Sequence, residues 1–295
     1  MPQIGEKPKK KIRWGWLLSV VLLLLAVPVA AAVLRQLNQP GQLPQPSEHR
    51  NTVTVNDGVR NAEIVPQAGV PVNELAAEAF SAQDGVISCA LARQGIDVSD
   101  YQGEIDWQAV ADSGVSFAFI RLGYRGATEG QLHLDQCFAE NLAGAREAGL
   151  DVGVYFFSQA LNAGEAVEEA DFVLQTLEGE ELDLPVMFDW EPVAKPGSRT
   201  AGRESRAISD CAEAFCIRLA DSDYDAGIYF NRQQGYYSYD LARLKDYAFW
   251  VADPNDHPDF YYAFRVWQYS FSGTVPGIET IVDRDLLFEK GGEQG

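Results

Sequence analysis

Two carboxylates stand two positions apart at the end of an apolar run, Pro185-Val186-Met187-Phe188-Asp189-Trp190-Glu191-Pro192. In a β-strand the side chains of residues i and i+2 share a face, so Asp189 and Glu191 point the same way and Trp190 points the opposite way. Two like charges roughly 6 to 7 Å apart along a strand raise the pKa of the less solvated group. One acid then stays protonated beside an ionised one, which is the equipment for hydrolysing a glycosidic bond. The alternative is a pair of solvated acids at a strand end.

Other acids lie in or just after the first and last candidate strands of the chain. Asp97 and Asp100 belong to the first, and Asp283 and Asp285 belong to the last. In a closed barrel these two strands are neighbours, and functional residues collect where barrel strands end. We therefore expect acids from three separate strands to meet at one mouth.

The sequence offers few residues for other hydrolytic chemistries. Its three histidines are too scattered for a histidine-based metal site or a catalytic triad, so we expect no metal ion and no cofactor. Four cysteines lack the CxxC spacing of a zinc site. A disulfide between Cys89 and Cys137 and buried free thiols are both open, whereas Cys211 and Cys216 fall five apart on a predicted helix, which is poor geometry for a bridge.

The elements that must position these acids alternate between strands and helices. Eight β-rich segments are candidate strands: 95–99, 116–124, 151–158, 185–191, 225–231, 248–253, 264–270 and 281–286. Helical segments fall between the earlier ones: 105–113, 134–148, 163–177, 208–220 and a short 241–246. Apolar strands alternating with helices indicate a parallel sheet, and eight strands indicate a closed barrel. We predict an α/β fold, an irregular TIM-like (β/α)5(β)3 barrel, over residues 94–290.

The N-terminal residues have a different composition. Residues 1–13 carry five basic side chains, and residues 14–34 form a 21-residue segment without a charge, long enough to span a bilayer as a helix. The basic residues before the span predict a cytoplasmic tip at 1–13, a transmembrane signal anchor at 14–34 and an exported remainder. A cleavable signal peptide is the alternative, because Ala30-Ala31-Ala32 supplies an A-x-A site, and the protein would then be secreted.

Residues 35–93 are rich in Gln, Pro, Asn, Gly and Ser and show no lasting period, so we predict an extended linker with a short helix near 74–80. The formal charge of the chain is −20, and beyond residue 35 the sequence holds 42 acidic and 17 basic side chains. Such a surface repels nucleic acid, which we exclude as a partner. We expect a monomer.

The segment 95–103, followed by Asp106-Trp107 and 117–121, resembles the opening of glycoside hydrolase family 25, the muramidases related to Chalaropsis-type lysozyme. The resemblance continues in family order to about residue 288, through 135–138, Asn141, 153–157, 189–191, 227–229, 250–252, 267–270 and 282–283. It implies an irregular barrel of five βα units and three closing strands. It also implies cleavage of the β-1,4 bond between N-acetylmuramic acid and N-acetylglucosamine in peptidoglycan, the expected partner.

Carried over residue by residue, the resemblance implies that Glu191 donates the proton to the leaving oxygen. Asp189 would orient and charge-stabilise the 2-acetamido group of the substrate, or attack the anomeric carbon directly. Asp97 and Asp283 would complete the acids of the site. Retention of configuration through the acetamido group is expected, while a direct nucleophile and an activated water remain alternatives that the spacing does not decide.

Polar aromatic and amide side chains near strand ends are candidate sugar contacts. The candidate substrate-binding residues are Tyr124, Tyr155, Tyr229, Trp250 and Gln268. Core packing is the alternative for each aromatic ring, and a hydrogen-bonding core role is the alternative for the amide. Asp100 and Asp106 fit capping roles, and Asp135 fits the start of a helix. A binding module without turnover and a metal hydrolase are the rival functions.

Overall fold

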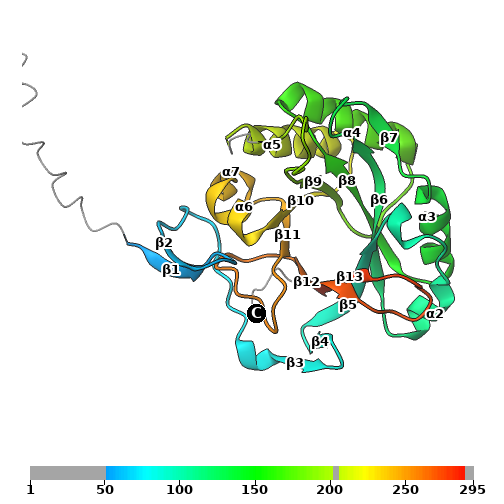
Figure 1. Cartoon of the computed structure of the whole chain (residues 1–295), viewed down its shortest axis with the longest axis horizontal. Coiled ribbons are helices and arrows are strands. Elements are labelled where there is room, and N and C mark those ends of the chain that lie inside the picture. The colour runs from blue at the N-terminus through cyan, green and yellow to red at the C-terminus, as the bar shows by residue number, and fades with distance from the viewer. Residues whose placement is uncertain (1–50, 202–205, 290–295) are drawn as a thin grey trace, which may run out of the picture. The chain divides into compact units, whose positions relative to one another are not determined.

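The computed structural model describes residues 51–201 and 206–289 (Figure 1). Eight strands close into a barrel, and β13 returns to pair with β5. In spatial order they are β5 (Ala92–Val98), β6 (Phe117–Arg125), β8 (Asp151–Ser158), β9 (Val186–Trp190), β10 (Ala226–Asn231), β11 (Ala248–Ala252), β12 (Val266–Gly273) and β13 (Val282–Phe288). Neighbours are parallel from β5 to β12, and β13 is antiparallel to both strands beside it. The predicted barrel and its eight strands are confirmed, with small shifts at the strand ends.

The predicted helices are present on the outside of the barrel (Figure 1). They are α2 (Trp107–Asp112), α3 (Phe138–Glu147), α4 (Ala163–Leu177), α5 (Arg206–Ala220) and α7 (Leu241–Leu244). Within the barrel region, one helix and one strand were not predicted: α6 (Arg232–Tyr237), and β7 (Leu132–Leu134), which pairs antiparallel with β6 outside the barrel ring. No helix follows β11 or β12. The order of five βα units followed by three closing strands is therefore as expected.

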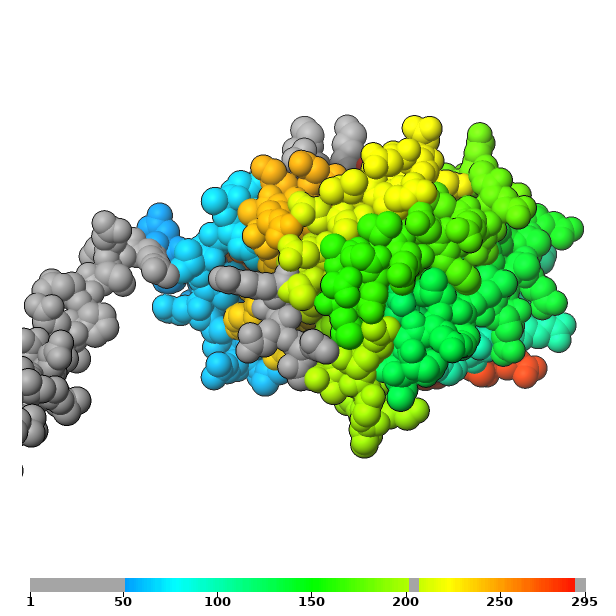
Figure 2. All heavy atoms as spheres, turned by 90° about the horizontal axis from the view of Figure 1, so that it is seen from above, coloured from blue at the N-terminus to red at the C-terminus, as the bar shows by residue number. Residues whose placement is uncertain are grey.

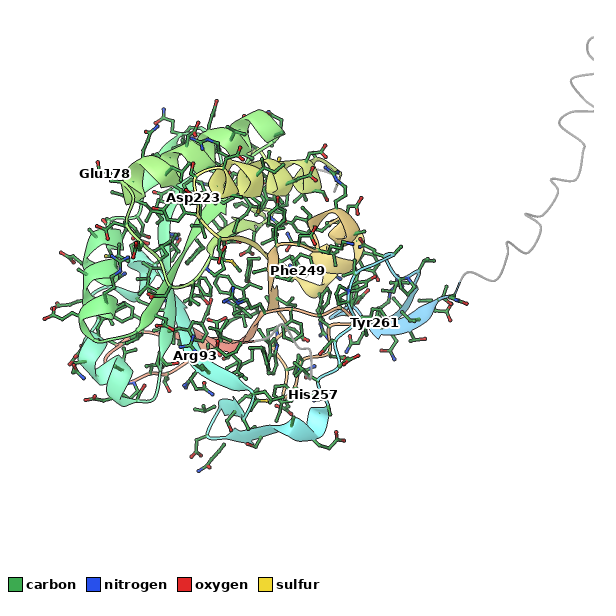
Figure 3. The ribbon with its side chains drawn as sticks, turned by 180° about the vertical axis from the view of Figure 1, so that it is seen from behind. Arg93, Glu178, Asp223, Phe249, His257 and Tyr261 are labelled. Atoms are coloured by element: carbon green, nitrogen blue, oxygen red, sulfur yellow. The ribbon has the colours of Figure 1, made fainter. Side chains whose placement is uncertain are left out.

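Large apolar side chains fill the barrel interior because small residues face them. A β-carbon added to Gly95 would lie 2.1 Å from the ring of Phe117, and one added to Gly153 would lie 2.4 Å from the ring of Phe119. The inward-facing cluster consists of Phe117, Phe119, Leu184, Met187, Tyr229, Trp250, Ala252, Val266 and Leu287. Figure 3 shows side chains crowding the space that the ribbon encloses. The barrel is a packed core that leaves room for a site only where the strands end.

Residues 51–93 correct the predicted linker. They form two antiparallel hairpins, β1 (Val53–Asn56) with β2 (Asn61–Ile64) and β3 (Phe80–Gln83) with β4 (Val86–Cys89). The helix expected near 74–80 is a single 3-10 turn, Ala77–Ala79. The rest of the predicted linker, 35–50, lies outside the described residues.

These hairpins pack on the barrel domain. The backbone N–H of Gln67 donates to the hydroxyl of Tyr262 at 2.8 Å, and the Phe80 and Trp267 rings meet edge to face at 5.4 Å. Figure 3 shows Tyr261 beside this segment, where its carbonyl accepts from the N–H of Asn73 at 2.9 Å. Figure 2 shows the blue hairpin residues against the orange part of the chain. The compact unit therefore begins near residue 51.

Two further expectations concern the membrane and the cysteines. Among residues 51–201 and 206–289, no helix combines the length and the apolar character that crossing a bilayer requires. The predicted cytoplasmic tip and anchor, 1–13 and 14–34, lie outside the described residues. All four cysteines are free, so the Cys89–Cys137 disulfide is absent.

Candidate active site

A cavity of about 200 Å³ opens where the barrel strands end. Its lining consists of Asp97, Ser99, Tyr101, Gln102, Arg121, Tyr155, Phe157, Asp189, Glu191, Tyr229, Trp250, Gln268 and Asp283. All four predicted catalytic acids are in this lining. Four of the five predicted substrate-binding residues are there as well, and Tyr124 is the exception. The structure thus gathers residues separated by up to 186 positions in the sequence.

The β9 strand presents its two acids as the period of a strand requires. Asp189 and Glu191 both face the cavity. Trp190 points away from it, is buried, and donates from its Nε1 to the carbonyl of Ala160 at 3.0 Å. The anchored tryptophan therefore holds Asp189 and Glu191 on the face of the strand that lines the cavity.

Asp97 and Asp283 lie directly opposite each other on the antiparallel strands β5 and β13. Gln268 joins them, because its Nε2 donates to Asp97 Oδ2 at 2.7 Å and to Asp283 Oδ2 at 3.3 Å. The hydroxyl of Tyr229 donates to the Oε1 of Gln268 at 2.8 Å, which fixes the orientation of the amide. Gln268 is thus a buried bridge between two acids of the cavity.

Burial is the first cause of the pKa shifts in this cavity. It raises the pKa of Asp97 well above the ordinary value, and the charges of Asp285 and Asp283 add to the shift. Burial and then the charge of Glu191 raise the pKa of Asp189, while Arg121 opposes them. Burial and then the charge of Asp283 raise the pKa of Glu191. Burial also raises the pKa of Asp283 to about 6. The cavity therefore retains protons near neutral pH, so a carboxylic acid is available as a proton donor.

Arg121 is a residue of the site that the sequence analysis did not select. Its Nη2 lies 2.5 Å from Asp100 Oδ1 and 2.7 Å from Asp135 Oδ2, and its Nε donates to Asp135 Oδ2 at 2.8 Å. The guanidinium also lies 5.2 Å from the ring centre of Tyr101. It is the one basic side chain in the described lining of the cavity, and two carboxylates hold it there.

The predictions for three neighbouring residues, Asp100, Asp106 and Tyr124, have different outcomes. Asp100 pairs with Arg121, and Ser99 is the residue that caps the following turn. Asp106 does cap α2, since its Oδ1 accepts from the N–H of Ala109 at 3.1 Å. Tyr124 lies outside the cavity because its ring stacks on His133 at 5.0 Å.

Buried amides hold the backbone on which Glu191 stands. The Nε2 of Gln159 donates to the carbonyl of Glu191 at 2.7 Å, and its Oε1 accepts from the hydroxyl of Thr200 at 2.7 Å. On the other side, the Nε2 of Gln234 donates to the carbonyl of Trp190 at 2.8 Å. Neither amide was predicted, because a glutamine after a strand or within a short helix carries no sequence signal of its partner.

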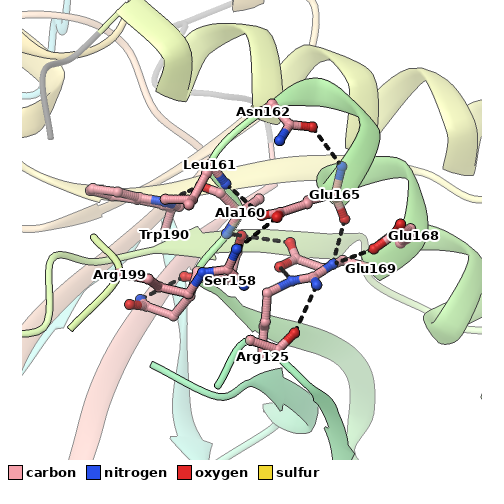
Figure 4. A network of polar contacts seen from close by, with 12 residues as sticks. Arg125, Ser158, Ala160, Leu161, Asn162, Glu165, Glu168, Glu169, Trp190 and Arg199 are labelled. Carbon is pink, nitrogen blue, oxygen red and sulfur yellow. Dashed lines mark hydrogen bonds and ion pairs between the residues drawn. The ribbon is translucent and has the colours of Figure 1, made fainter. Parts of the chain in front are cut away.

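The end of β8 is fixed by a polar network behind the cavity (Figure 4). The hydroxyl of Ser158 donates to Glu169 Oε2 at 2.6 Å, and the Nε of Arg125 donates to Glu169 Oε1 at 2.7 Å. The Nη2 of Arg125 also donates to the carbonyl of Glu165 at 2.8 Å. This network ties β6 and β8 to α4, and Gln159 follows immediately after it.

The chain is similar to known proteins over about two thirds of its length. Residues 96–278 match the family model described as glycosyl hydrolases family 25. The autolytic lysozyme of Clostridium acetobutylicum is 30% identical over 198 residues, which cover 66% of this chain and 56% of that protein. Lysozyme M1 of Streptomyces globisporus is 31% identical over 202 residues, covering 65% of this chain and 66% of that protein. The chain thus spans between about half and two thirds of the length of these two relatives.

A solved structure shares the fold. The bacterial lysozyme from Streptomyces coelicolor superimposes with a TM-score of 0.51 at 26% identity, covering 67% of this chain and 93% of that one.

Proposed function

The chain belongs to glycosyl hydrolases family 25, and from that membership we propose that it is a peptidoglycan muramidase. The bond cleaved is the β-1,4 bond between N-acetylmuramic acid and N-acetylglucosamine. The observation that supports this most is the gathering of Asp97, Asp189, Glu191 and Asp283 from three strands into one cavity. The two relatives named above are both called lysozymes, which supports the same activity.

In the proposed reaction Glu191 donates a proton to the leaving oxygen. Its raised pKa supports this role, because a general acid must hold its proton at the working pH. Asp189 orients and charge-stabilises the 2-acetamido group, which attacks the anomeric carbon. Asp97 and Asp283 bind sugar hydroxyls, and the charge of Asp283 helps to keep the proton on Glu191.

The stereochemistry of the product tests the assistance by the acetamido group. Retention is expected from that group and also from direct attack by Asp189, whereas attack by an activated water gives inversion. A substrate whose acetamido group is replaced by a hydroxyl separates the first two, because only direct attack by Asp189 survives the replacement.

Digestion of purified peptidoglycan by the full-length chain tests the activity itself. We expect new reducing ends of N-acetylmuramic acid, and we expect Glu191→Gln to lower the rate by about 10²- to 10⁴-fold, the usual contribution of a general acid. Glu147→Gln, an exposed change on α3, is the matched control and should retain full activity. Reducing N-acetylglucosamine ends would reassign the bond, and binding without any release would indicate a glycan-binding module. Activity abolished by a chelator would favour the metal hydrolase.

We also propose that residues 14–34 anchor the protein and place the barrel outside the cell, where peptidoglycan lies. The uncharged segment of 21 residues and the basic residues before it support this arrangement. Membrane fractions washed with carbonate should retain the full-length chain, and protease added outside should digest the barrel domain. A shortened chain in the medium would show cleavage after a signal peptide. We propose a monomer, which light scattering of the purified chain tests.

A further inference from the structure

A fifth carboxyl group lies directly beneath the cavity without lining it. Asp285 is fully buried on β13, two residues after Asp283. Its Oδ1 accepts a hydrogen bond from the Nε1 of Trp250 at 2.8 Å. Its Oδ2 is also buried, and no N–H or hydroxyl group of the described residues donates to it. A buried oxygen of this kind requires an explanation, because an ionised carboxylate without donors is costly in a protein interior.

A second acid lies beside Asp285 on the neighbouring strand. The register of β5 and β13 places Asp283 opposite Asp97 and places Asp285 opposite Gly95, so Asp285 and Asp97 are diagonal neighbours on one face. Diagonal neighbours on one face of a sheet lie close enough for their side chains to meet, and the charge of Asp285 raises the pKa of Asp97. An ionised carboxylate only accepts hydrogen bonds, so a bond between two carboxyl groups requires one of them to hold a proton.

The surrounding charges favour that proton. Asp283, on the same strand as Asp285, raises the pKa of both members of the pair through its charge. Asp189 and Glu191, at the end of β9, line the same cavity as Asp97. From β11 and β12 the pair receives only neutral donors, the indole of Trp250 and the amide of Gln268. The phenols of Tyr155 and Tyr229 stay neutral, since burial raises the pKa of each.

Among residues 51–201 and 206–289, Arg121 on β6 is the one basic side chain that lines the cavity, and it already pairs with Asp100 and Asp135. Burial and the charge of Asp283 raise the pKa of Asp285 to about 8. Two negative charges on Asp97 and Asp285 would therefore lie close together in a region without a free counter-charge.

We propose that Asp285 is a positioning residue that shares a single proton with Asp97, so that Asp97 meets the substrate as half of a hydrogen-bonded acid pair. This proposal rests on the proposed function in one respect, which is that Asp97 faces a bound sugar. Because of the shared proton, the net charge at the mouth of the barrel is one unit less negative than it would be if every acid were ionised. The bond to the indole of Trp250 fixes Asp285, which in turn fixes the side chain of Asp97.

The indole N–H of Trp250 allows the pair to be observed without substrate. Its resonance in a ¹⁵N-correlated spectrum of the full-length protein, identified by its loss in Trp250→Phe, reports the charge on Asp285. Between about pH 4 and about pH 9 we expect it to titrate with a midpoint well above the ordinary range of an aspartic acid. A resonance that stays fixed over this range, or titrates near an ordinary value, overturns the proposal. This measurement is decisive even if the protein cleaves no peptidoglycan.

Asp285→Asn provides the second measurement. An amide keeps the acceptor for Trp250 and offers an N–H to Asp97, but it cannot ionise. Removing the charge of Asp285 lowers the pKa of Asp97, so the limb of the pH profile of kcat/KM that Asp97 governs should move to lower pH by on the order of one unit. The Trp250 resonance should no longer titrate in this variant.

Asp253→Asn is the matched control. Asp253 is also a fully buried acid, but it lies at the end of β11, pairs with Arg232 at 3.2 Å and does not line the cavity. The pH profile of kcat/KM of this control variant should match that of the parent protein. A loss that is only structural lowers the stability of the fold without shifting the pKa that governs the profile. A profile of Asp285→Asn that superimposes on the parent overturns the proposal.

Discussion

Burial raises the pKa of the carboxyl groups at the mouth of the barrel, and the folded state depends on pH as a consequence. Burial raises the pKa of Asp283 to about 6, and burial with the charge of Asp283 raises that of Asp285 to about 8. Both values exceed those of the unfolded chain, so between the unfolded and folded pKa values the folded state binds more protons. The stability that these groups contribute is present at low pH and is lost as the pH rises through about 6 to 8.

We therefore expect the melting temperature of the protein to fall between about pH 5 and about pH 8. One pKa unit corresponds to about 1.4 kcal/mol, and each kcal/mol changes the melting temperature of a domain of this size by about 2 to 4 °C. Calorimetry at the two pH values checks this. Asp285→Asn should flatten the dependence, because the amide does not ionise. A melting temperature that rises over this interval would contradict the expectation.

Single residues differ in how far the sequence predicts them. The four catalytic candidates could be predicted because acids at the ends of apolar strands have no role in the core. The partners of Arg121 could not, since Asp100 and Asp135 lie 21 and 14 positions away and each has a plausible capping role of its own. The burial of Asp285 depends on Trp250 from another strand, so its position in β13 alone did not distinguish it from Asp283.

At the scale of elements, the end of β9 depends on its neighbours for its geometry. Gln159, at the end of β8, holds the carbonyl of Glu191, and Gln234 in α6 holds that of Trp190. Both donors are buried, so neither bond exchanges readily with water. The position of the proton donor is therefore set from two sides by side chains that do not themselves line the cavity.

We expect Gln159→Met to lower kcat by about tenfold to 100-fold with little change in KM, because a small displacement of Glu191 affects proton transfer more than sugar binding. The free energy of unfolding should fall by about 1 to 3 kcal/mol, since the hydroxyl of Thr200 and the carbonyl of Glu191 each lose a hydrogen bond. Steady-state kinetics and urea unfolding measure the two effects. Gln108→Met, which removes only a surface bond to Asp112, is the control. A change confined to KM would argue against the positioning role.

The strands and longer helices followed from apolar runs and their periods. The missed helix α6 has the sequence Arg-Gln-Gln-Gly-Tyr-Tyr, which has no apolar period and includes a glycine. A signal was nevertheless present, since Asn231 and Gln234 form a capping box at its start. Short elements of this kind are specified by their caps and their tertiary contacts, and a search for periodicity does not detect them.

At the scale of the whole molecule, the N-terminal hairpins were the largest difference from expectation. Their strands have four residues each, too few for an alternating pattern to stand out from the turns between them. Their buried side chains are few as well: Val55, Ile64, Val70, Ile87 and Cys89. They are stable because they pack on the barrel domain, which is information that local composition does not contain.

Phe80→Ala tests that packing. Phe80 meets Trp267 and Phe288 edge to face at 5.4 and 6.3 Å, so its loss should lower the free energy of unfolding by about 1.5 kcal/mol. Val59→Ala, at a residue that is 76% exposed, should have almost no effect. Chemical unfolding of the full-length protein gives both values. Equal stability of the two variants would mean that the hairpins contribute nothing to the fold.

The antiparallel strand β13 has a consequence for the order of synthesis. It supplies Asp283 and Asp285, and it also joins β12 to β5, so the barrel ring stays open until β13 has been synthesised. A nascent chain interrupted before residue 282 would lack two of the five acids and would expose two unpaired strand edges, a template for aggregation. Catalytic competence and closure of the sheet therefore depend on the same strand.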